Sequence, residues 1–290
     1  MLVTWRYRAR RSLIQSFDPR AWLIFYACFL ATSLLFWDLR FLAVLFAIAL
    51  IVVLTSGVTW RESRRAWLFI GGFIVFFAFL TFLTGRGGME LYTVEHTLTT
   101  VSFPFTLLGW RPTLNITVER LFYAISQLAR VFGIASMTIL IPYSLNPIHY
   151  GVTFRGLGLP DRIAYAMDLT MRFIPTFGRD FQLTLDAQRA RGYEIENLRG
   201  GPIALVRRLA PLIVPVTIHA IIGSEDIIDA MDLRAFGVGP RTWLQELHYH
   251  WRDYALIACG VLLFVVGVSL SLFGYGRFWV PDWALRWAGG

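Results

Sequence analysis

The stretch YALIACGVLLFVVGVSLSLFG occupies residues 254–274 and carries no charged side chain. About 20 apolar residues in a helix are enough to cross the hydrocarbon core of a bilayer. Four further apolar stretches of similar composition lie at residues 21–37, 41–54, 66–83 and 121–141. The second of these reaches spanning length with its flanks, and the last contains a single charge, Arg130. We therefore predict an all-α polytopic membrane protein with about five transmembrane helices.

Composition supports this class and excludes one kind of activity. Of the 290 residues, 56% are hydrophobic and 16% are charged, which is less charge than soluble domains usually carry. All 27 basic residues are arginine, because the sequence contains no lysine. A phosphate-binding P-loop needs its lysine, so the chain has no such loop. The net charge of +8 is better explained by arginines that mark the cytoplasmic side of a membrane protein than by nucleic-acid binding.

The positions of the arginines also predict the orientation. Twenty lie on one side of the predicted spans, counting the N-terminal segment, the turn before the third span and residues 142–253, against five on the other side. Cytoplasmic loops are enriched in arginine, so we expect the N-terminus and residues 142–253 to be cytoplasmic and the C-terminus external. The stretch RRSLIQSF at 10–17 resembles a twin-arginine export signal, but no small-residue cleavage site follows it. We expect a first helix that is retained.

These patterns divide the chain into four regions. Residues 1–20 form a cytoplasmic segment, residues 21–141 hold the first four spans, and residues 254–290 hold the last span and an external C-terminus. Within the second region, the external connection at 84–115 is rich in threonine and other β-formers, so a helix is unexpected there. Residues 142–253 form a cytoplasmic-side domain of amphipathic helices.

The first part of this domain contains a helix that ends in arginine. The pattern indicates a helix that begins near residue 161 and is stopped by Pro175, followed by a charged helix that ends on Gly192. Glycine is the preferred residue just past a helix C-terminus. Arg189 and Arg191, in the last turn of that helix, complement the negative end of its dipole.

A second element of this kind follows. It begins with an apolar piece that is interrupted by Pro211 and Pro215 and is too short to span a bilayer unaided. Its later part is amphipathic. One sector holds the apolar residues Ile227, Ile228, Met231 and Ala235, and an acidic stripe beside it holds Glu225, Asp229 and Asp232. Arg234 lies near its end and is followed by Gly237.

Two helix ends in this domain thus present an arginine beside small residues. A guanidinium stays charged and forks onto carboxylates, and small neighbours allow a partner to approach closely. This pattern fits docking into a groove on a partner protein. It also fits helices that lie in the membrane interface and are anchored at lipid phosphates, and composition alone leaves both explanations open.

Taken together, these segments resemble the transmembrane T component of energy-coupling factor (ECF) transporters, which are vitamin and metal-ion importers of prokaryotes. DAQRARG carries the first Ala-Arg-Gly motif of that family at Ala190-Arg191-Gly192, and DAMDLRAFG lies where the second is expected. Supporting pieces are FDPR (17–20), NP (146–147), MRFIP (171–175) and RRLAPLIVPV (207–216). The second motif departs from the pattern, because it reads Leu233-Arg234-Ala235. Alanine adopts the left-handed conformation only at a cost, so we expect that helix to continue to Gly237.

The resemblance implies a scaffold in the prokaryotic inner membrane. Two cytoplasmic ABC-type ATPases would each receive one coupling helix, through residues Ala190, Arg191 and Gly192 at one end and Arg234, Ala235 and Gly237 at the other. A membrane-embedded, substrate-binding S component would pack on the apolar helix faces, which here contain Ile227, Ile228 and Met231. ATP-driven motion would pass through the helices and tilt the S component, which releases a vitamin or a metal ion. The chain itself would have no catalytic residue, cofactor, metal site or nucleic-acid partner, and it would lie in the lipid bilayer.

Two other functions remain open. An intramembrane, Mg²⁺-dependent prenyltransferase would use an aspartate-rich helix such as the one that holds Asp226, Asp229 and Asp232. It would need a second acidic cluster, for which Asp180 and Asp186 are the nearest candidates. An autonomous secondary transporter would show inverted repeats and polar residues at mid-membrane, and we find no internal repeat.

A few isolated polar residues complete the candidates. Arg130 has three open explanations, namely an ion pair with Glu119, a contact with a partner chain, or snorkelling to the interface. Cys28 and Cys259 lie inside apolar runs, where cysteines usually pack as small hydrophobes. His248 and His250 are two positions apart, which points their rings away from each other on a helix.

Overall fold

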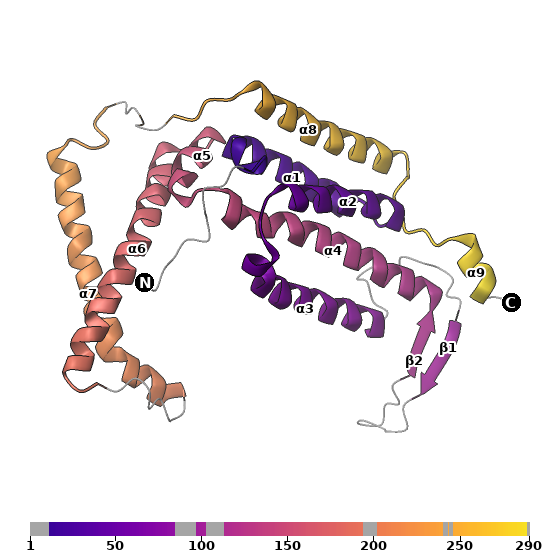
Figure 1. Ribbon diagram of the computed structural model, residues 1–290, viewed down its shortest axis with the longest axis horizontal. Coiled ribbons are helices and arrows are strands. Elements are labelled where there is room, and N and C mark those ends of the chain that lie inside the picture. Colours follow the sequence, from indigo (N-terminus) through magenta and orange to yellow (C-terminus); the bar gives the residue numbers. More distant parts are fainter. Residues whose placement is uncertain are drawn as a thin grey trace. The chain divides into compact units, whose positions relative to one another are not determined.

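The computed structural model describes residues 12–84, 97–102, 113–193, 202–239, 243 and 246–288. It confirms an all-α polytopic membrane protein, since the described residues form helices apart from one short hairpin and the connecting segments (Figure 1). The described chain divides into two compact units. One is formed within Asn146–Leu247 and is called the coupling unit below. The other is formed within Tyr7–Leu145 and His248–Gly290 and is called the membrane unit.

The membrane unit is built around helix α4. Its elements are η1 (Ile14–Ser16), α1 (Pro19–Leu35), α2 (Leu39–Thr55), α3 (Trp60–Thr84), α4 (Val118–Ser144), α8 (Trp251–Leu272) and α9 (Asp282–Ala288). All five predicted spans are helices, namely α1, α2, α3, α4 and α8. Helices α1, α2 and α3 pack on α4, and α8 packs on α1. Half of the α4 span is buried inside the chain, against 11% of α3 and of α8, so α4 is the central helix.

A β-hairpin precedes α4, in a connection where the threonine-rich composition predicted only that a helix is unexpected. Strands β1 (Thr97–Ser102) and β2 (Thr113–Thr117) pair antiparallel, with Ser102 opposite Thr113 and an irregularity between Thr97 and Thr99. Strand β2 leads directly into α4 (Figure 1). The remainder of the predicted 84–115 connection lies outside the described residues.

Helix α8 approaches α1 closely through two glycines. A Cβ atom at Gly260 would lie 3.1 Å from the Cα of Phe25, and one at Gly267 would lie 2.8 Å from Cγ2 of Thr32. Small residues at helix interfaces are a common packing device in membranes, because backbone proximity replaces the hydrophobic driving force. The first and last spans of the chain are therefore joined by direct backbone packing.

A buried carboxylate fastens the same two helices at their N-terminal ends. Asp253, 1% exposed, accepts hydrogen bonds from the backbone N–H of Asp18 at 2.7 Å and of His250 at 2.7 Å. Asp18 in turn caps α1 by accepting from the N–H of Arg20 at 2.8 Å, and its carboxylate pairs with the Arg20 guanidinium at 2.7 Å. The FDPR segment at 17–20 thus acts as a helix cap and as the attachment point of α8.

An aromatic ring completes this cluster. The Arg20 guanidinium lies 3.9 Å above the ring of Tyr249, which precedes α8. Burial raises the pKa of the Tyr249 phenol, against the lowering effect of the Arg20 charge. The phenol therefore stays neutral at physiological pH and supplies a cation–π partner for Arg20.

Arg130 has a partner that the sequence did not suggest. The side chain lies on α4 and is 7% exposed. Its Nη2 donates to the carbonyl oxygen of Phe36, the residue just after α1, and its guanidinium lies 4.2 Å above the ring of Trp37. A carbonyl at a helix C-terminus carries the negative end of the helix dipole. Neither an ion pair with Glu119 nor snorkelling therefore describes this arginine. Its Nη2 is bonded within the membrane unit, whereas its buried Nε has no hydrogen-bond partner among the described residues.

The coupling unit consists of η2 (Pro147–His149), α5 (Tyr150–Gly156), α6 (Asp161–Ala190) and α7 (Pro202–Leu233). The prediction that Pro175 stops a helix is wrong, because α6 continues through it, and α7 likewise continues through Pro211 and Pro215. A proline inside a helix removes one hydrogen bond and frees the carbonyl four residues earlier. Pro215 frees the carbonyl of Pro211, which accepts from Nε2 of Gln188 on α6 at 3.3 Å.

Helix α7 is also longer and more apolar than expected. Its segment Leu209–Leu233 is long and apolar enough to cross a membrane, so the expectation of a piece too short to span is wrong. Its last turns, however, carry four exposed carboxylates, on Glu225, Asp226, Asp229 and Asp232. A carboxylate at the centre of a bilayer costs about 2.5–3.5 kcal/mol on insertion scales. Length favours a span, whereas this charge disfavours one.

Candidate functional site: two arginine turns

Helices α6 and α7 form an antiparallel pair whose two C-terminal ends lie far apart. Near the end of α6, Gln188 contacts Pro211 of α7. Near the beginning of α6, the hydroxyl of Tyr165 lies 3.9 Å from Sδ of Met231, close to the end of α7. The C-terminal part of each helix therefore contacts the early part of the other. Figure 1 shows the two helices crossing.

The first arginine turn follows α6 and has the predicted form. Ala190 is the last helical residue, Arg191 is the C-cap, and Gly192 has a φ of +82°. The N–H of Tyr193 donates to the carbonyl of Gln188 at 3.0 Å, which is the bond expected when a left-handed residue ends a helix. A Cβ on Gly192 would meet nothing within 4 Å. Glycine is favoured here by the backbone angle and not by lack of space.

The guanidinium of this turn is available to a partner. Arg191 is exposed and has no ion pair with any residue that the structure describes. The neighbouring Arg189, in contrast, lies 3.6 Å from the carboxylate of Asp186 one turn earlier. The two arginines of DAQRARG therefore differ, since one is engaged within its own helix and the other is not.

The second arginine turn follows α7 and departs from the prediction. The helix ends at Leu233 and does not continue to Gly237. Ala235 itself adopts the left-handed conformation with a φ of +51°, and Gly237 has a φ of +89°. The N–H of Phe236 donates to the carbonyl of Met231 at 3.0 Å, the same closing bond as in the first turn. Arg234 is exposed at the start of this turn.

An aromatic contact explains how alanine replaces glycine in this turn. A left-handed residue with a Cβ costs about 1–2 kcal/mol, so other contacts must hold the backbone. The ring of Phe236 packs on Tyr165 of α6 with centroids 4.6 Å apart, and the Tyr165 hydroxyl contacts Met231. Aromatic packing of this kind contributes about 0.5–1.5 kcal/mol beyond buried area, which is comparable with the cost of the turn.

Replacing Ala235 with glycine should therefore stabilise the protein by about 0.5–1 kcal/mol, because glycine adopts this φ without steric penalty. Thermal unfolding in detergent would measure the change, with a midpoint expected to rise by about 1–3 °C. Ala190→Gly is the matched control, since Ala190 is helical and glycine there should lower the midpoint. A lower midpoint for Ala235→Gly would contradict the left-handed turn.

The exposed side of α7 changes character along its length. Its middle carries large apolar side chains that are more than half exposed, namely Ile213, Val214, Ile218, Ile221 and Ile222. Among the predicted contact residues, Ile228 is 55% exposed, Ile227 is half-buried, and Met231 faces Tyr165. The prediction that Ala235 shares a helix sector with these residues is wrong, because Ala235 lies beyond the end of α7. An apolar partner therefore has the middle of α7 and Ile228 to pack against.

The other candidate residues form no reactive cluster in the described part of the chain. Asp226, Asp229 and Asp232 are exposed on α7, and no group of three or more His, Cys, Asp or Glu residues there is placed to hold a metal ion. Cys28 is half-buried and Cys259 is exposed, and both are free thiols.

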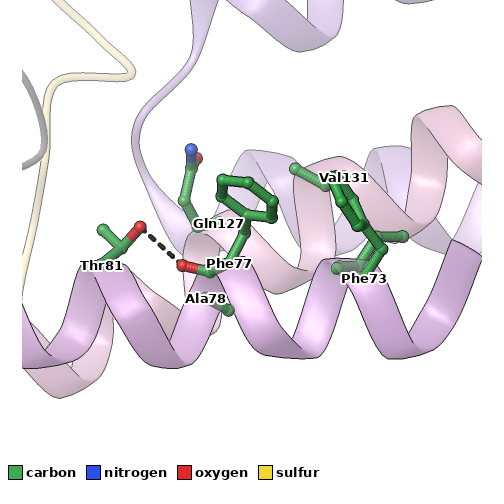
Figure 2. Close-up of a pocket in the computed structure, with 7 residues that line it drawn as sticks. Phe73, Phe77, Ala78, Thr81, Gln127 and Val131 are labelled. Carbon is green, nitrogen blue, oxygen red and sulfur yellow. Dashed lines mark hydrogen bonds between the residues drawn. The ribbon is translucent and has the colours of Figure 1, made fainter. Parts of the chain in front are cut away.

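A cavity of about 170 Å³ lies between α3 and α4. Figure 2 shows the rings of Phe73 and Phe77 on α3 with Gln127 and Val131 of α4 beside them. The hydroxyl of Thr81 donates to the carbonyl of Phe77 at 2.8 Å within its own helix. Apart from the amide of Gln127 and the hydroxyl of Thr81, which is hydrogen-bonded within α3, the residues that line the cavity are apolar. The cavity suits a hydrocarbon chain better than a polar reactant.

Comparison with known proteins shows similarity along most of the chain. Residues 10–243 match the family described as CbiQ, cobalt transport protein. The energy-coupling factor transporter transmembrane protein EcfT of Staphylococcus aureus is 26% identical over 283 residues, which cover 92% of this chain and 98% of that protein. The protein of the same name from Listeria innocua is 26% identical over 96% of this chain and 98% of its own length. The EcfT of Exiguobacterium sibiricum is 32% identical over 56% of this chain and 62% of its own length.

Proposed function

Because the chain belongs to the CbiQ family of cobalt transport proteins and its relatives are ECF transporter transmembrane proteins, we propose that it is the scaffold that couples two ATPase subunits to a substrate-binding membrane protein. Arg191 and Arg234 dock into the two ATPases. The apolar side of α7 holds the substrate-binding S component. Hydrolysis of ATP takes place on the partner chains and not on this one.

The position of the two arginine turns is the observation that carries this proposal. Each turn follows a helix C-terminus, has a left-handed residue and exposes an arginine. Since α6 and α7 are antiparallel, the turns lie at opposite ends of the pair and are accessible to two separate subunits. A guanidinium that forks onto a carboxylate gives a directional, charge-assisted contact. One helix pair therefore holds two similar partners at once.

Contacts between α6 and α7 make the pair suitable for transmitting motion. Gln188, three residues before Arg191, donates to Pro211, and Phe236, two residues after Arg234, packs on Tyr165. Each arginine turn is thus attached to the other helix as well as to its own. A displacement of one ATPase would move both helices, since each turn is attached to the other helix by one of these contacts.

The charge on α7 argues for a place at the membrane interface. Carboxylates on its last turns favour water, while Ile218 and Ile222 in its middle are apolar and exposed. We place residues 1–20 and 142–253 on the cytoplasmic side, where ATP is available, and α7 at the boundary with the S component. Cargo identity, a vitamin or a metal ion, depends on the S component in this arrangement.

Co-purification tests the proposal. The chain would be co-expressed with the ABC ATPases encoded nearest to it, and purified through a tag on the chain in mild detergent. We expect two ATPase subunits per chain by quantitative mass spectrometry. Purification without any ATPase under these conditions, from membranes that contain both proteins, would refute the coupling role.

The apolar face of α7 gives a separate prediction. Replacing Ile228 with aspartate places a charge on a side chain that is 55% exposed, so folding should be preserved. Burying that charge against an apolar partner is unfavourable, so recovery of the S component should fall about tenfold while ATPase recovery stays unchanged. Asp229→Asn, on the acidic side, is the control. Equal recovery of the S component with Ile228→Asp would show that this face has another role.

A further inference from the structure

The short connection between α8 and α9 is held against the turn that joins α1 and α2. The N–H of Trp37 in that turn donates to the carbonyl of Gly276 at 2.8 Å. Gly276 has a φ of +86°, and a Cβ there would lie 2.2 Å from the ring of Phe36. Only glycine permits this approach. The connection therefore has a defined position within the membrane unit (Figure 1).

A cavity of about 470 Å³ opens between this connection and the start of α2. Its lining includes the charged residues Asp38, Arg40 and Arg277 and the aromatic residues Tyr275 and Trp279. Two guanidinium groups and one carboxylate leave one positive charge in excess. The walls beside these charges are aromatic, so the cavity combines cationic and apolar surfaces.

The carboxylate in this cavity is already occupied by local contacts. Asp38 is 1% exposed, caps α2 by accepting from the N–H of Arg40 at 2.9 Å, and pairs with the Arg40 guanidinium at 2.8 Å. That guanidinium also lies 3.8 Å above the ring of Trp279, yet the Arg40 side chain remains 60% exposed. Its outer N–H groups therefore stay available to a ligand.

Arg277 supplies the excess charge. It is exposed at the cavity and makes no ion pair, hydrogen bond or ring contact with any residue that the structure describes. Arg277 and Arg40 line the same cavity. Like charges repel each other, so an anion bound between them would lower their electrostatic energy. The cavity is therefore suited to an anionic group that accepts two hydrogen bonds from Arg277 and also contacts Arg40.

The location of the cavity indicates the source of that anion. It lies where the apolar helices α1 and α8 end and α2 begins, at Leu35, Leu272 and Leu39, which is the depth of lipid headgroups. Tyr275 is 62% exposed, and Trp283 in α9 is 70% exposed. Exposed tyrosine and tryptophan at helix ends are characteristic of the membrane–water interface.

We propose that this cavity binds the phosphate group of an anionic membrane phospholipid through Arg277 and Arg40, with the glycerol portion against Trp279 and Tyr275. The bound lipid supplies the counter-charge that Arg277 lacks among the described residues. It also fixes the α8–α9 connection to the bilayer surface. A free phosphate ion would meet the same guanidinium groups, but it would leave the exposed ring of Tyr275 uncovered.

Native mass spectrometry of the purified protein, exchanged into micelles that contain equal amounts of phosphatidylglycerol and phosphatidylcholine, tests this site. The wild type should retain phosphatidylglycerol preferentially, and Arg277→Gln should lower that retention about fivefold, the effect of one arginine near an anionic lipid surface. Arg277→Lys should keep most of the preference. Arg286→Gln, an exposed arginine on α9 outside the cavity, should behave like the wild type.

Three results would overturn the proposal. The first is equal retention of phosphatidylglycerol by the wild type and Arg277→Gln. The second is an equal loss in Arg286→Gln, which would indicate general surface charge instead of a site. The third is displacement of the lipid by millimolar inorganic phosphate, which would make free phosphate the ligand. Unchanged thermal midpoints would show that the variants are folded. If Arg277→Gln does not fold, lipid retention by Arg277→Lys is compared with that of the wild type instead.

Discussion

Replacing both Arg191 and Arg234 with alanine should reduce the ATPase recovered with this chain by about a hundredfold, with about a tenfold loss for each single replacement. Losing a hydrogen bond between a guanidinium and a carboxylate of the ATPase should cost about 1.5–3 kcal/mol of binding free energy. A change of about 1.4 kcal/mol corresponds to a factor of ten in affinity. Both side chains are exposed at helix ends, so insertion into the membrane should be unaffected. Quantitative mass spectrometry of tagged complexes in detergent measures the effect.

Arg189 provides the control for this experiment. It lies two residues before Arg191 but is paired with Asp186 at 3.6 Å, so Arg189→Ala changes the net charge by the same amount without removing a docking group. We expect its ATPase recovery to stay within about twofold of the wild type, as for an exposed ion pair of small energy. Equal losses in Arg189→Ala and Arg191→Ala would show that general positive charge, and not the turn, recruits the ATPase.

The second large effect concerns stability. Asp253→Ala should destabilise the protein by about 2–6 kcal/mol, because the backbone N–H groups of Asp18 and His250 would lose their buried acceptor and each such loss costs about 1–3 kcal/mol. The N-terminal ends of α1 and α8 would separate as a result. Thermal unfolding in detergent should show a midpoint lower by several degrees.

Asp282→Ala is the comparison for this variant, since Asp282 is an exposed carboxylate in the first turn of α9. Its midpoint should change by less than about 2 °C, as for most surface replacements. Midpoints that are the same for Asp253→Ala and the wild type would contradict the role of Asp253 as a joint between α1 and α8.

The apolar stretches were enough to predict the membrane helices, because uncharged runs near 20 residues have few stable alternatives. Prolines misled the prediction in the coupling unit. Pro175 and Pro215 lie inside long helices, and a rule based on local hydrogen bonding treats each as a stop. The contact that compensates one of them, Gln188 to Pro211, joins residues 23 positions apart. Sequence spacing does not indicate such a contact.

The two arginine turns were predictable to different degrees. Gly192 marks the first turn because its residue type matches its backbone angle. The second turn could not be predicted from Ala235, because nothing in the local sequence favours a left-handed alanine. The contact that stabilises this turn, Phe236 on Tyr165, involves another helix. The same limitation applies to Arg130, whose partners are a carbonyl and a ring after α1. Local patterns identify helix ends, while tertiary contacts decide the exceptions.

Site-specific photocrosslinking tests the central claim most directly. A photoreactive amino acid would replace Arg189, in the last turn of α6, or Val238, which is 83% exposed just after the second turn, in cells that express the ATPases and an S component. We predict ATPase adducts from both positions and an S-component adduct from Ile218 in the middle of α7. The absence of an ATPase adduct at either turn, in cells where the Ile218 adduct forms, would contradict a scaffold that holds two ATPases by its two arginine turns.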